Sequence, residues 1–305
     1  MFKHILIPID GSVLAEAALP AAVFLAEKLQ ARITLMHVME RNAPGKVHGQ
    51  PHLKDPQDAE RYLNELAKRS FPERIRVDCH VHANEVDDVA GSIVAHADEL
   101  KHDLVIMCSH GRGAALHMFL GSIAQSVIAL GGQPVLITHP DEQGQPPAFS
   151  CRHILVPMDD NPEHAKALPV SKDLARACGA TLHIVSVIPE LATLSGDKAA
   201  ASKMLPGTTS QLLELTAQDA NKYFQNMEDG LRQEGFEASA HVLRGDPASL
   251  IVEAAVRAQI DLIVISTHGK TGMNAFWSGS VAHRICCQSR IPLLLIPIKS
   301  QGDSK

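Results

Sequence analysis

Residues His4–Asp10 read HILIPID, and residues His153–Asp159 read HILVPMD. Each is a short aliphatic run that ends on an aspartate, which is typical of a buried strand in a parallel sheet. The same displacement, from residue 4 to residue 153, relates Ile33–Val38 to Leu182–Val187. Self-similarity over this length indicates that one unit of structure occurs twice in tandem.

Each repeat alternates between strand and helix patterns. In the first repeat, apolar runs fall at Ile5–Ile9, Ile33–Val38, Leu104–Met107 and Val135–Ile137, and helical patterns at Ala15–Leu29, Ala59–Lys68, Val89–Ala97 and Gln125–Leu130. This alternation predicts a doubly wound α/β domain with a parallel sheet. Ligands of such sheets bind beyond the carboxyl ends of the strands, where the strand order switches.

The repeats set the predicted domain boundaries. We expect domains at residues 1–139 and 152–299, joined by a linker at residues 140–151 that is rich in proline, glycine and polar residues. The second repeat is longer around Leu191–Thr209. This stretch is rich in Ser, Gly, Ala and Thr, and we expect it to be a loop.

Composition excludes several classes of protein. The 305 residues are 45% hydrophobic and carry a net charge of -6, with only 4% aromatic residues. An acidic chain with few aromatic residues is a poor partner for nucleic acid. No apolar run reaches the length of a membrane span, and we expect a cytoplasmic protein. Six cysteines without a C-x-x-C pair indicate reduced thiols and not a disulfide framework.

A glycine motif follows the fourth strand of each repeat. Cys108-Ser109-His110-Gly111 is followed by nine residues, Arg112 to Leu120, and then by Gly121-Ser122. Ser266 to Gly269 is followed by the same spacing and then by Gly279-Ser280. Glycines and a helix N-terminus can expose backbone N–H groups to an anion, which predicts a phosphate cradle. The simpler alternative is a helix N-cap.

These motifs resemble the universal stress protein family in its tandem two-domain form. Nucleotide-binding members carry G-x-x-G, nine residues and G-S/T, together with an aspartate after the first strand. The first glycine is replaced here by Cys108 and by Ser266. The resemblance implies two five-stranded, adenine nucleotide alpha hydrolase-like domains. It also implies that their last strands, at residues 134–137 and 292–296, pair within the chain around a pseudo-twofold axis.

The resemblance also implies a set of nucleotide-binding residues. Aspartates near the ribose and phosphates, with or without a metal ion, would be Asp10 and Asp159. Valines that offer backbone groups to adenine would be Val38 and Val187. Residues that hold phosphates would be Gly111, Gly121, Ser122, Gly269, Gly279 and Ser280, beside the replaced positions Cys108 and Ser266. Arg112 and Lys270 follow the cradle glycine and are either phosphate contacts or solvated loop residues.

The two predicted sites differ in one loop. Arg244-Gly245-Asp246-Pro247 resembles the family's G-x-P loop beside adenine, so Gly245 joins the candidate residues and the second site is favoured. The first repeat has Ala83–Val86 there, and Asn84 would tolerate a left-handed turn. Against this ranking, the second repeat carries an extra carboxylate, Asp160, near the phosphates.

Three functions remain open from the sequence. The favoured one is an adenine-nucleotide-binding protein of stress response or signalling, which holds ATP or AMP, with or without Mg²⁺, and turns over little or none. The alternatives are a slow ATP hydrolase, for which no Walker motif or catalytic triad is found, and a ligand-free scaffold. A metal site is undecided, because His80 and His82 share one face of a strand but two ligands do not define a zinc site. Pairing of two such chains is also left open.

Overall fold

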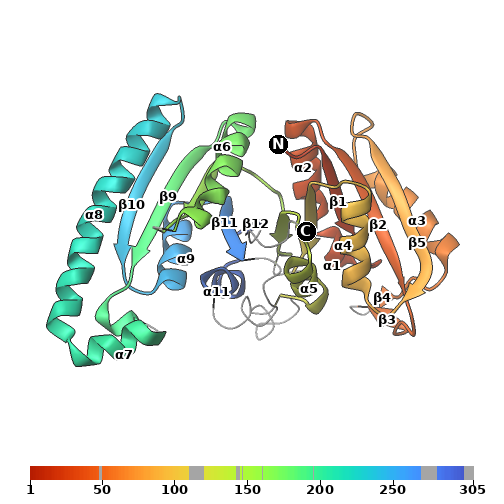
Figure 1. Ribbon diagram of the computed structural model, residues 1–305. Helices are drawn as coiled ribbons and strands as arrows, with labels where there is room; N and C mark the ends of the chain where they lie inside the picture. Colours follow the sequence, from red (N-terminus) through yellow and green to blue (C-terminus); the bar gives the residue numbers. More distant parts are fainter. Residues whose placement is uncertain are drawn as a thin grey trace.

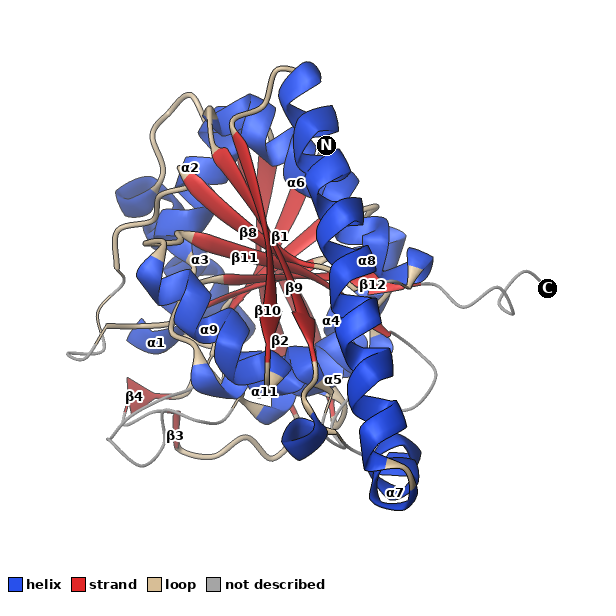
Figure 2. Cartoon of the chain, turned by 90° about the vertical axis from the view of Figure 1, so that its left-hand side faces the viewer, coloured by secondary structure: helices blue, strands red, loops and turns tan. Residues whose placement is uncertain are grey.

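The computed structural model describes residues 1–47, 50–109, 120–141, 145, 147–159, 161–194, 196–268 and 280–298. Within these residues one ten-stranded sheet runs in the order β10-β9-β8-β11-β12-β7-β6-β1-β2-β5. Helices cover both of its faces, and the strands fan through the centre of the molecule (Figure 2). The prediction of two doubly wound five-stranded units is confirmed.

The first half supplies the strands at one end of the sheet (Figure 1). Its strands are β1 (His4–Pro8), β2 (Arg32–Glu40), β5 (Val77–Val86), β6 (Leu104–Cys108) and β7 (Val135–Thr138), with a small hairpin of β3 (Lys46–Val47) and β4 (Gln50–Pro51). Its helices are α1 (Val13–Glu16), α2 (Leu19–Leu29), α3 (Pro56–Ser70), α4 (Val89–Glu99) and α5 (Ser122–Leu130). The predicted helix at Ala15–Leu29 is therefore divided into two.

The second half repeats this order with a longer insertion. Its strands are β8 (His153–Pro157), β9 (Thr181–Ile188), β10 (Ala238–Arg244), β11 (Leu262–His268) and β12 (Leu293–Ile298). Its helices are the 3-10 turns η1 (Pro162–Lys166) and η2 (Leu191–Thr193) and the α-helices α6 (Ala167–Cys178), α7 (Gly196–Met204), α8 (Pro206–Gln233), α9 (Pro247–Arg257) and α11 (Val281–Gln288).

Two sequence-based expectations about local structure are wrong. The insertion around Leu191–Thr209 is mostly helical, because its alanine, lysine and methionine residues favour α7 and a proline begins α8. Asn84 makes no left-handed turn, because it lies inside β5, which continues to Val86 through a shift in its register with β2. The strand ends only before Asp88, which caps α4.

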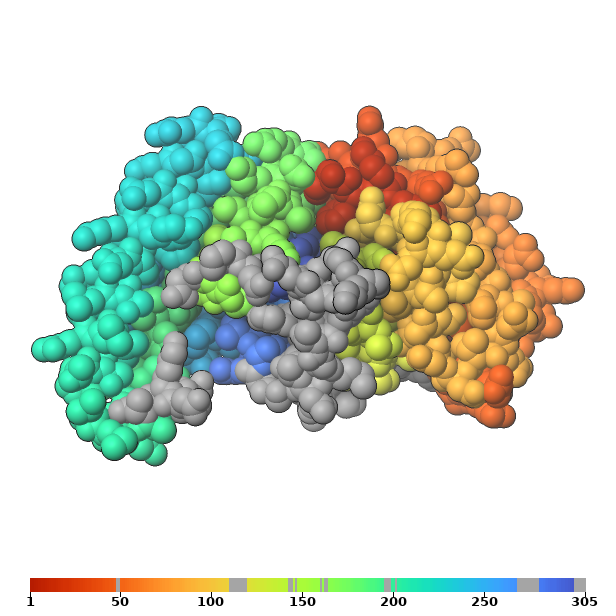
Figure 3. Space-filling view, in the orientation of Figure 1, coloured from red at the N-terminus to blue at the C-terminus, as the bar shows by residue number. Residues whose placement is uncertain are grey.

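Two apolar layers hold the helices on the sheet. One layer packs α2 and α3 of the first half and α6 and α8 of the second against one face. The other packs α4, α5, α9 and α11 against the opposite face. Both layers contain residues from both halves, so the core is continuous across the molecule. Figure 3 shows the halves as two adjoining lobes.

The seam between the halves is an antiparallel pair of strands. Leu293, Leu294 and Leu295 of β12 face Ile137, Leu136 and Val135 of β7. Every other strand pair of the large sheet is parallel within the described residues. The expected pairing of the last strands is therefore observed. It covers two apolar edges that would otherwise invite association.

Candidate functional site

Strand order places the candidate residues at two equivalent switch points. In the first half the order reverses between β1 and β6, and in the second between β8 and β11. The carboxyl ends of these strands lead into Asp10 and Cys108 in one half and into Asp159 and Ser266 in the other. The ends of β2 and β9, which carry Val38 and Val187, lie beside them.

The aspartate of the first half stabilises a tight turn. Oδ1 of Asp10 accepts hydrogen bonds from the backbone N–H of Ser12 at 2.9 Å and from its hydroxyl at 2.7 Å. Gly11 between them has a φ of +87°, in the left-handed region that favours glycine. Ser12 then caps α1 by accepting from the N–H of Ala15.

A segment from the β3–β4 hairpin covers this turn. A Cβ placed on Gly11 would lie 3.0 Å from Cδ1 of Leu53. Oε1 of Gln50 accepts the N–H of Val13 at 2.7 Å. That N–H is one of the free donors at the start of α1 that could otherwise face an anion. The turn after Asp10 is therefore covered by the chain itself.

The same segment reaches toward the predicted adenine position. The side chain of His52 is only 6% exposed, and its ring lies 6.2 Å from that of His37. His37 contacts the carbonyl of Ile9 at 2.7 Å and precedes Val38, which is buried. Burial lowers the pKa of His37, so the ring is neutral near pH 7.

The second half uses its aspartate differently. Asp159 contacts Nδ1 of His164 at 2.7 Å and accepts the N–H of Asn161 at 3.1 Å. The Asp159 side chain remains 49% exposed. His164 belongs to η1, which begins at a proline and packs against β11 and β12. Sequence reasoning missed His164, although its place five residues after the aspartate was a usable signal.

The two replacements of the family's first glycine play separate structural roles. The hydroxyl of Ser266 donates to the carbonyl of His164 at 2.7 Å and accepts the N–H of Ala167 at 3.0 Å. It therefore connects β11 to the start of α6. The thiol of Cys108 points to the carbonyl of Ser109 at 3.1 Å, and burial raises its pKa to about 12.

The predicted adenine loop of the second half is a sharp turn. Gly245 has a φ of +142°, and its N–H donates to the carbonyl of Ile188 at 3.1 Å. Asp246 caps α9 through Ser249 and forms a bidentate pair with Arg284 of α11 at 2.8 and 2.7 Å. The Arg284 guanidinium holds the pKa of Asp246 well below its usual range. This pair ties the loop beside Val187 to the cradle helix.

The cradle helices start differently in the two halves. Ser280 caps α11, because its hydroxyl accepts the N–H of His283 at 3.2 Å. Gly121 takes the cap position of α5 and Ser122 is its first residue. The simpler N-cap role is therefore observed for Ser280. The predicted residues Gly111, Arg112, Gly269, Lys270 and Gly279 lie outside the described residues, as does Asp160.

The histidine pair on β5 lies next to a third histidine, which belongs to α4. The rings of His80 and His82 each lie 4.9 Å from the ring of His96. Within the part of the chain that the structure describes, however, no three His, Cys, Asp or Glu side chains are placed to hold a metal ion. No helix of this part is long and apolar enough to cross a membrane.

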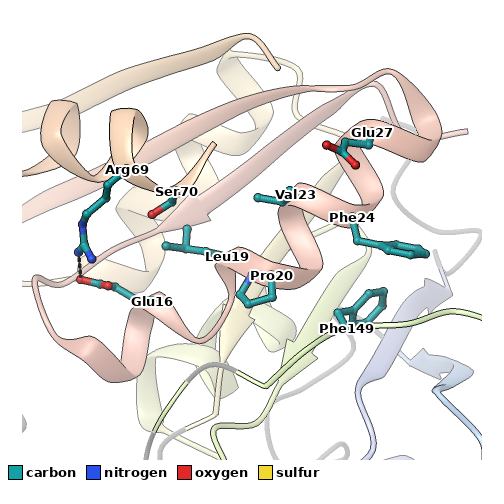
Figure 4. Close-up of a pocket in the computed structure, with 9 residues that line it drawn as sticks. All are labelled: Glu16, Leu19, Pro20, Val23, Phe24, Glu27, Arg69, Ser70 and Phe149. Carbon is teal, nitrogen blue, oxygen red and sulfur yellow. Dashed lines mark hydrogen bonds and ion pairs between the residues drawn. The ribbon is translucent and has the colours of Figure 1, made fainter. Parts of the chain in front are cut away.

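A separate open cavity of about 540 Å³ lies on the outer side of α2 (Figure 4). Phe24 meets Phe149 of the linker edge to face, at 5.3 Å between ring centroids. At the other end, Glu16 accepts hydrogen bonds from Arg69 at 2.6 Å and from Tyr62 at 2.7 Å. The cavity lies away from the strand ends and contains none of the predicted site residues.

The fold and the strand-end residues define a tandem protein of the doubly wound α/β class with one strand-order switch point in each half. The sequence profile of the universal stress protein family matches residues 1–139 and 150–297. The chain therefore belongs to the universal stress protein family.

Similar proteins cover the chain to different extents. A universal stress protein of Mycobacterium tuberculosis is 26% identical over 197 residues, which are 63% of this chain and 61% of that protein. One of Mycolicibacterium smegmatis is 24% identical over 310 residues and 96% of both chains. The crystal structure of a universal stress protein from Archaeoglobus fulgidus matches the fold with a TM-score of 0.68 at 19% identity, over 99% of this chain and 98% of that one.

Proposed function

We propose that the second half binds one adenine nucleotide, ATP or AMP, and that the protein acts in stress response or signalling with little or no turnover. The observation that carries this proposal is the half-exposed carboxylate of Asp159 beside Ser266 at a strand-order switch. A crevice at this point is where doubly wound sheets bind their ligands.

In this proposal the Asp159 carboxylate accepts a hydrogen bond from a ribose hydroxyl. Backbone groups of Val187 and Gly245 face the base. The phosphates lie toward Ser280 at the N-terminus of α11, where the helix dipole favours an anion. Gly269, Lys270 and Gly279 would complete the phosphate side. The Asp159 carboxylate would help to hold an accompanying Mg²⁺, which would offset the negative charge of the phosphates.

For the first half we propose a scaffold role. This role is supported by Leu53 and Gln50, which lie against the turn after Asp10, and by the buried side chain of His52 near His37, which precedes Val38. Displacing them would expose buried apolar surface and leave the N–H of Val13 without its acceptor. Cys108, Gly111, Arg112, Gly121 and Ser122 would then shape the fold and bind no nucleotide.

Native mass spectrometry followed by titration with ATP and Mg²⁺ tests both parts of the proposal. We expect one equivalent of adenine nucleotide per chain at saturation. Binding of two equivalents would show that Leu53 and Gln50 move away from the turn at Asp10. Binding of no nucleotide would support the ligand-free scaffold.

Slow ATP hydrolysis is the second candidate, and the contact between Asp159 and His164 favours it. A histidine that is oriented by a carboxylate can act as a general base. Release of phosphate over many turnovers, lost in His164→Asn with nucleotide binding retained, would support this alternative. Binding without release would support the first proposal.

A further inference from the structure

Helix α8 and the residue before it carry a second row of apolar side chains, which is exposed. Leu205, Leu212, Leu215 and Tyr223 are each more than half exposed, and we call these four residues the outer stripe. Steps of seven, three and eight residues keep side chains on one side of an α-helix, because 3.6 residues make a turn. The buried side chains of α8, such as Phe224, lie on another side. The helix therefore has two apolar faces, and the fold buries only one of them.

The first half shows that core packing does not require the outer stripe. Tyr223 matches Tyr62 of α3 (62 against 223), and Tyr62 is partly buried. Helix α3 is described over its whole length, and none of its large apolar side chains is exposed. It begins at Pro56, the match of Ala217, so residues 206–216 of α8 are an addition to the repeat. These added turns carry much of the outer stripe.

The added turns extend beyond the sheet. The 28 residues of α8 span about 42 Å, whereas the 7 residues of β10, against which the helix packs, span about 23 Å. The helix lies at the outer edge of the second half and continues past the strands to α7 (Figure 2). Met204, at the turn between α7 and α8, is 83% exposed. Another helix can therefore approach the outer stripe from the side away from the sheet.

We propose that the outer stripe binds the same stripe of a second copy of this chain, with the two α8 helices packed antiparallel around a twofold axis. Leu205, Thr208, Leu212 and Leu215 have the alternating three- and four-residue spacing of helices that pair along their length. In the dimer, Leu212 of each copy packs against Leu215 of the other. Such an interface is isologous and closes on itself, so it yields a dimer and no fibre.

Charge complementarity supports this antiparallel register. Placing Leu212 against Leu215 puts Asp219 of one copy against Thr208 of the other, in the first turn of α8. No side chain of the described residues caps the N-terminus of this helix, and a carboxylate is favourable there. Each copy would therefore supply an acidic group to the helix N-terminus of the other.

The side chains around the stripe cause no repulsion between two copies. Gln211 and Gln218 flank it and are uncharged. The carboxylate of Glu214 is already paired with Arg244 of its own chain at 2.9 Å. The alkyl chain of Lys222 can lie over the apolar start of the other α8, while its ammonium group stays in solvent. A second copy of this chain therefore fits the stripe in charge as well as in shape.

The size of the stripe predicts a reversible dimer. Leucine-sized side chains that are more than half exposed amount to about 500 Å² per copy, so the pair would bury about 1,000 Å², the lower limit of a specific interface. We expect a dissociation constant of about 1–100 μM.

Sedimentation velocity of the full chain over a wide range of concentrations tests the proposal. We expect a monomer–dimer equilibrium in the wild type. Leu212→Glu should raise the dissociation constant at least about tenfold, because it places a charge at the centre of the interface. Val256→Glu is the matched control, because Val256 is an apolar residue of α9 that is 67% exposed and lies outside the stripe. Both variants should keep the melting temperature of the wild-type monomer, since neither side chain is buried.

Two further measurements test the register. Leu215→Lys alone should also weaken the dimer, whereas the double variant Leu212→Glu/Leu215→Lys should dimerise more strongly than either single variant, because each glutamate then meets a lysine of the other copy. Asp219→Asn should raise the dissociation constant about three- to tenfold, because two such contacts with a helix N-terminus are lost. Asp229→Asn, an exposed change near the other end of α8, should have no effect.

The proposal is overturned if the wild-type chain remains monomeric at high concentration, which would leave the stripe to a different protein. It is also overturned if a dimer forms with the same affinity in Leu212→Glu, since the copies would then meet through another surface. A double variant that is weaker than both single variants would contradict the antiparallel packing.

Discussion

The two halves of this chain share one topology and differ in what lies over the strand ends. In the first half, Leu53 and Gln50, which lie in the connection after β2, cover the turn at Asp10. In the second, the corresponding connection forms α7 and the start of α8, and Asp159 keeps a half-exposed carboxylate. The comparison teaches that a duplicated sheet preserves its switch points, while the connection after its second strand differs in what it places over them.

The largest expected effect separates the two aspartates. Asp159→Ala should weaken ATP binding about 10- to 100-fold, because it removes a hydrogen bond to a charged acceptor. Asp10→Ala, its match in the covered half, should leave the affinity unchanged. Isothermal titration of both variants measures this difference. Equal losses of affinity would contradict the assignment of one working site.

The cover over the first half can be tested through Gly11. Gly11→Ala should cost about 2–3 kcal/mol of unfolding free energy, because the new Cβ meets Leu53 and the positive φ disfavours a side chain. Urea denaturation measures the cost. Gly179→Ala is the control, because its φ of +69° is also positive but its Cβ would meet nothing within 4 Å. A cost of about 1 kcal/mol is expected there, and equal costs would show that Leu53 does not resist displacement.

A buried histidine before β6 in the first half is replaced by an apolar residue in the second half. His102 is 4% exposed, and its counterpart 158 positions later (102 against 260) is Ile260. Burial and the adjacent His4 lower the pKa of His102 to about 4. A folded-state pKa below the unfolded value means that protonation favours unfolding, so this stability is present above about pH 6.5 and is lost as the pH falls toward 4.

His102→Ile should therefore reduce the loss of unfolding free energy between pH 7.5 and pH 5 by about 1–2 kcal/mol. Urea denaturation of the wild type and the variant at both pH values provides the measurement. His241→Ile, on the exposed edge strand β10, is the control for the change of side chain. An unchanged loss in His102→Ile would contradict the role of this ring.

The smallest effect concerns the pair of Asp246 and Arg284. The first half has Ser126 where the second has Arg284 (126 against 284), so Arg284→Ser makes the halves alike at this position. We expect Arg284→Ser to lower the unfolding free energy by about 1 kcal/mol at pH 7. The effect is small because both side chains are partly exposed and solvent screens the pair. The lowered pKa of Asp246 means that the loss should shrink only when the pH falls well below 4. If the loss of unfolding free energy does not vary with pH, it arises from packing and not from the ion pair.

The sheet and its switch points were predictable because they depend on local patterns. Aliphatic runs that end on Asp10 and Asp159 mark strands, and the repeat fixes their equivalence. What covers each of these strand ends was not predictable. The contact of Leu53 with Gly11 joins residues about forty positions apart, and side-chain volume against a turn leaves no periodic signal. Ser266 replaces the family's first glycine, and its hydroxyl donates a hydrogen bond to the backbone of η1, which the sequence does not reveal.

The antiparallel seam of β7 and β12 has a mechanical consequence. Because both halves share apolar layers and a row of main-chain bonds, neither can melt without exposing an edge of the other. We therefore expect the whole chain to unfold in one cooperative transition. A nucleotide held only by the second half would then raise the melting temperature of the first half as well.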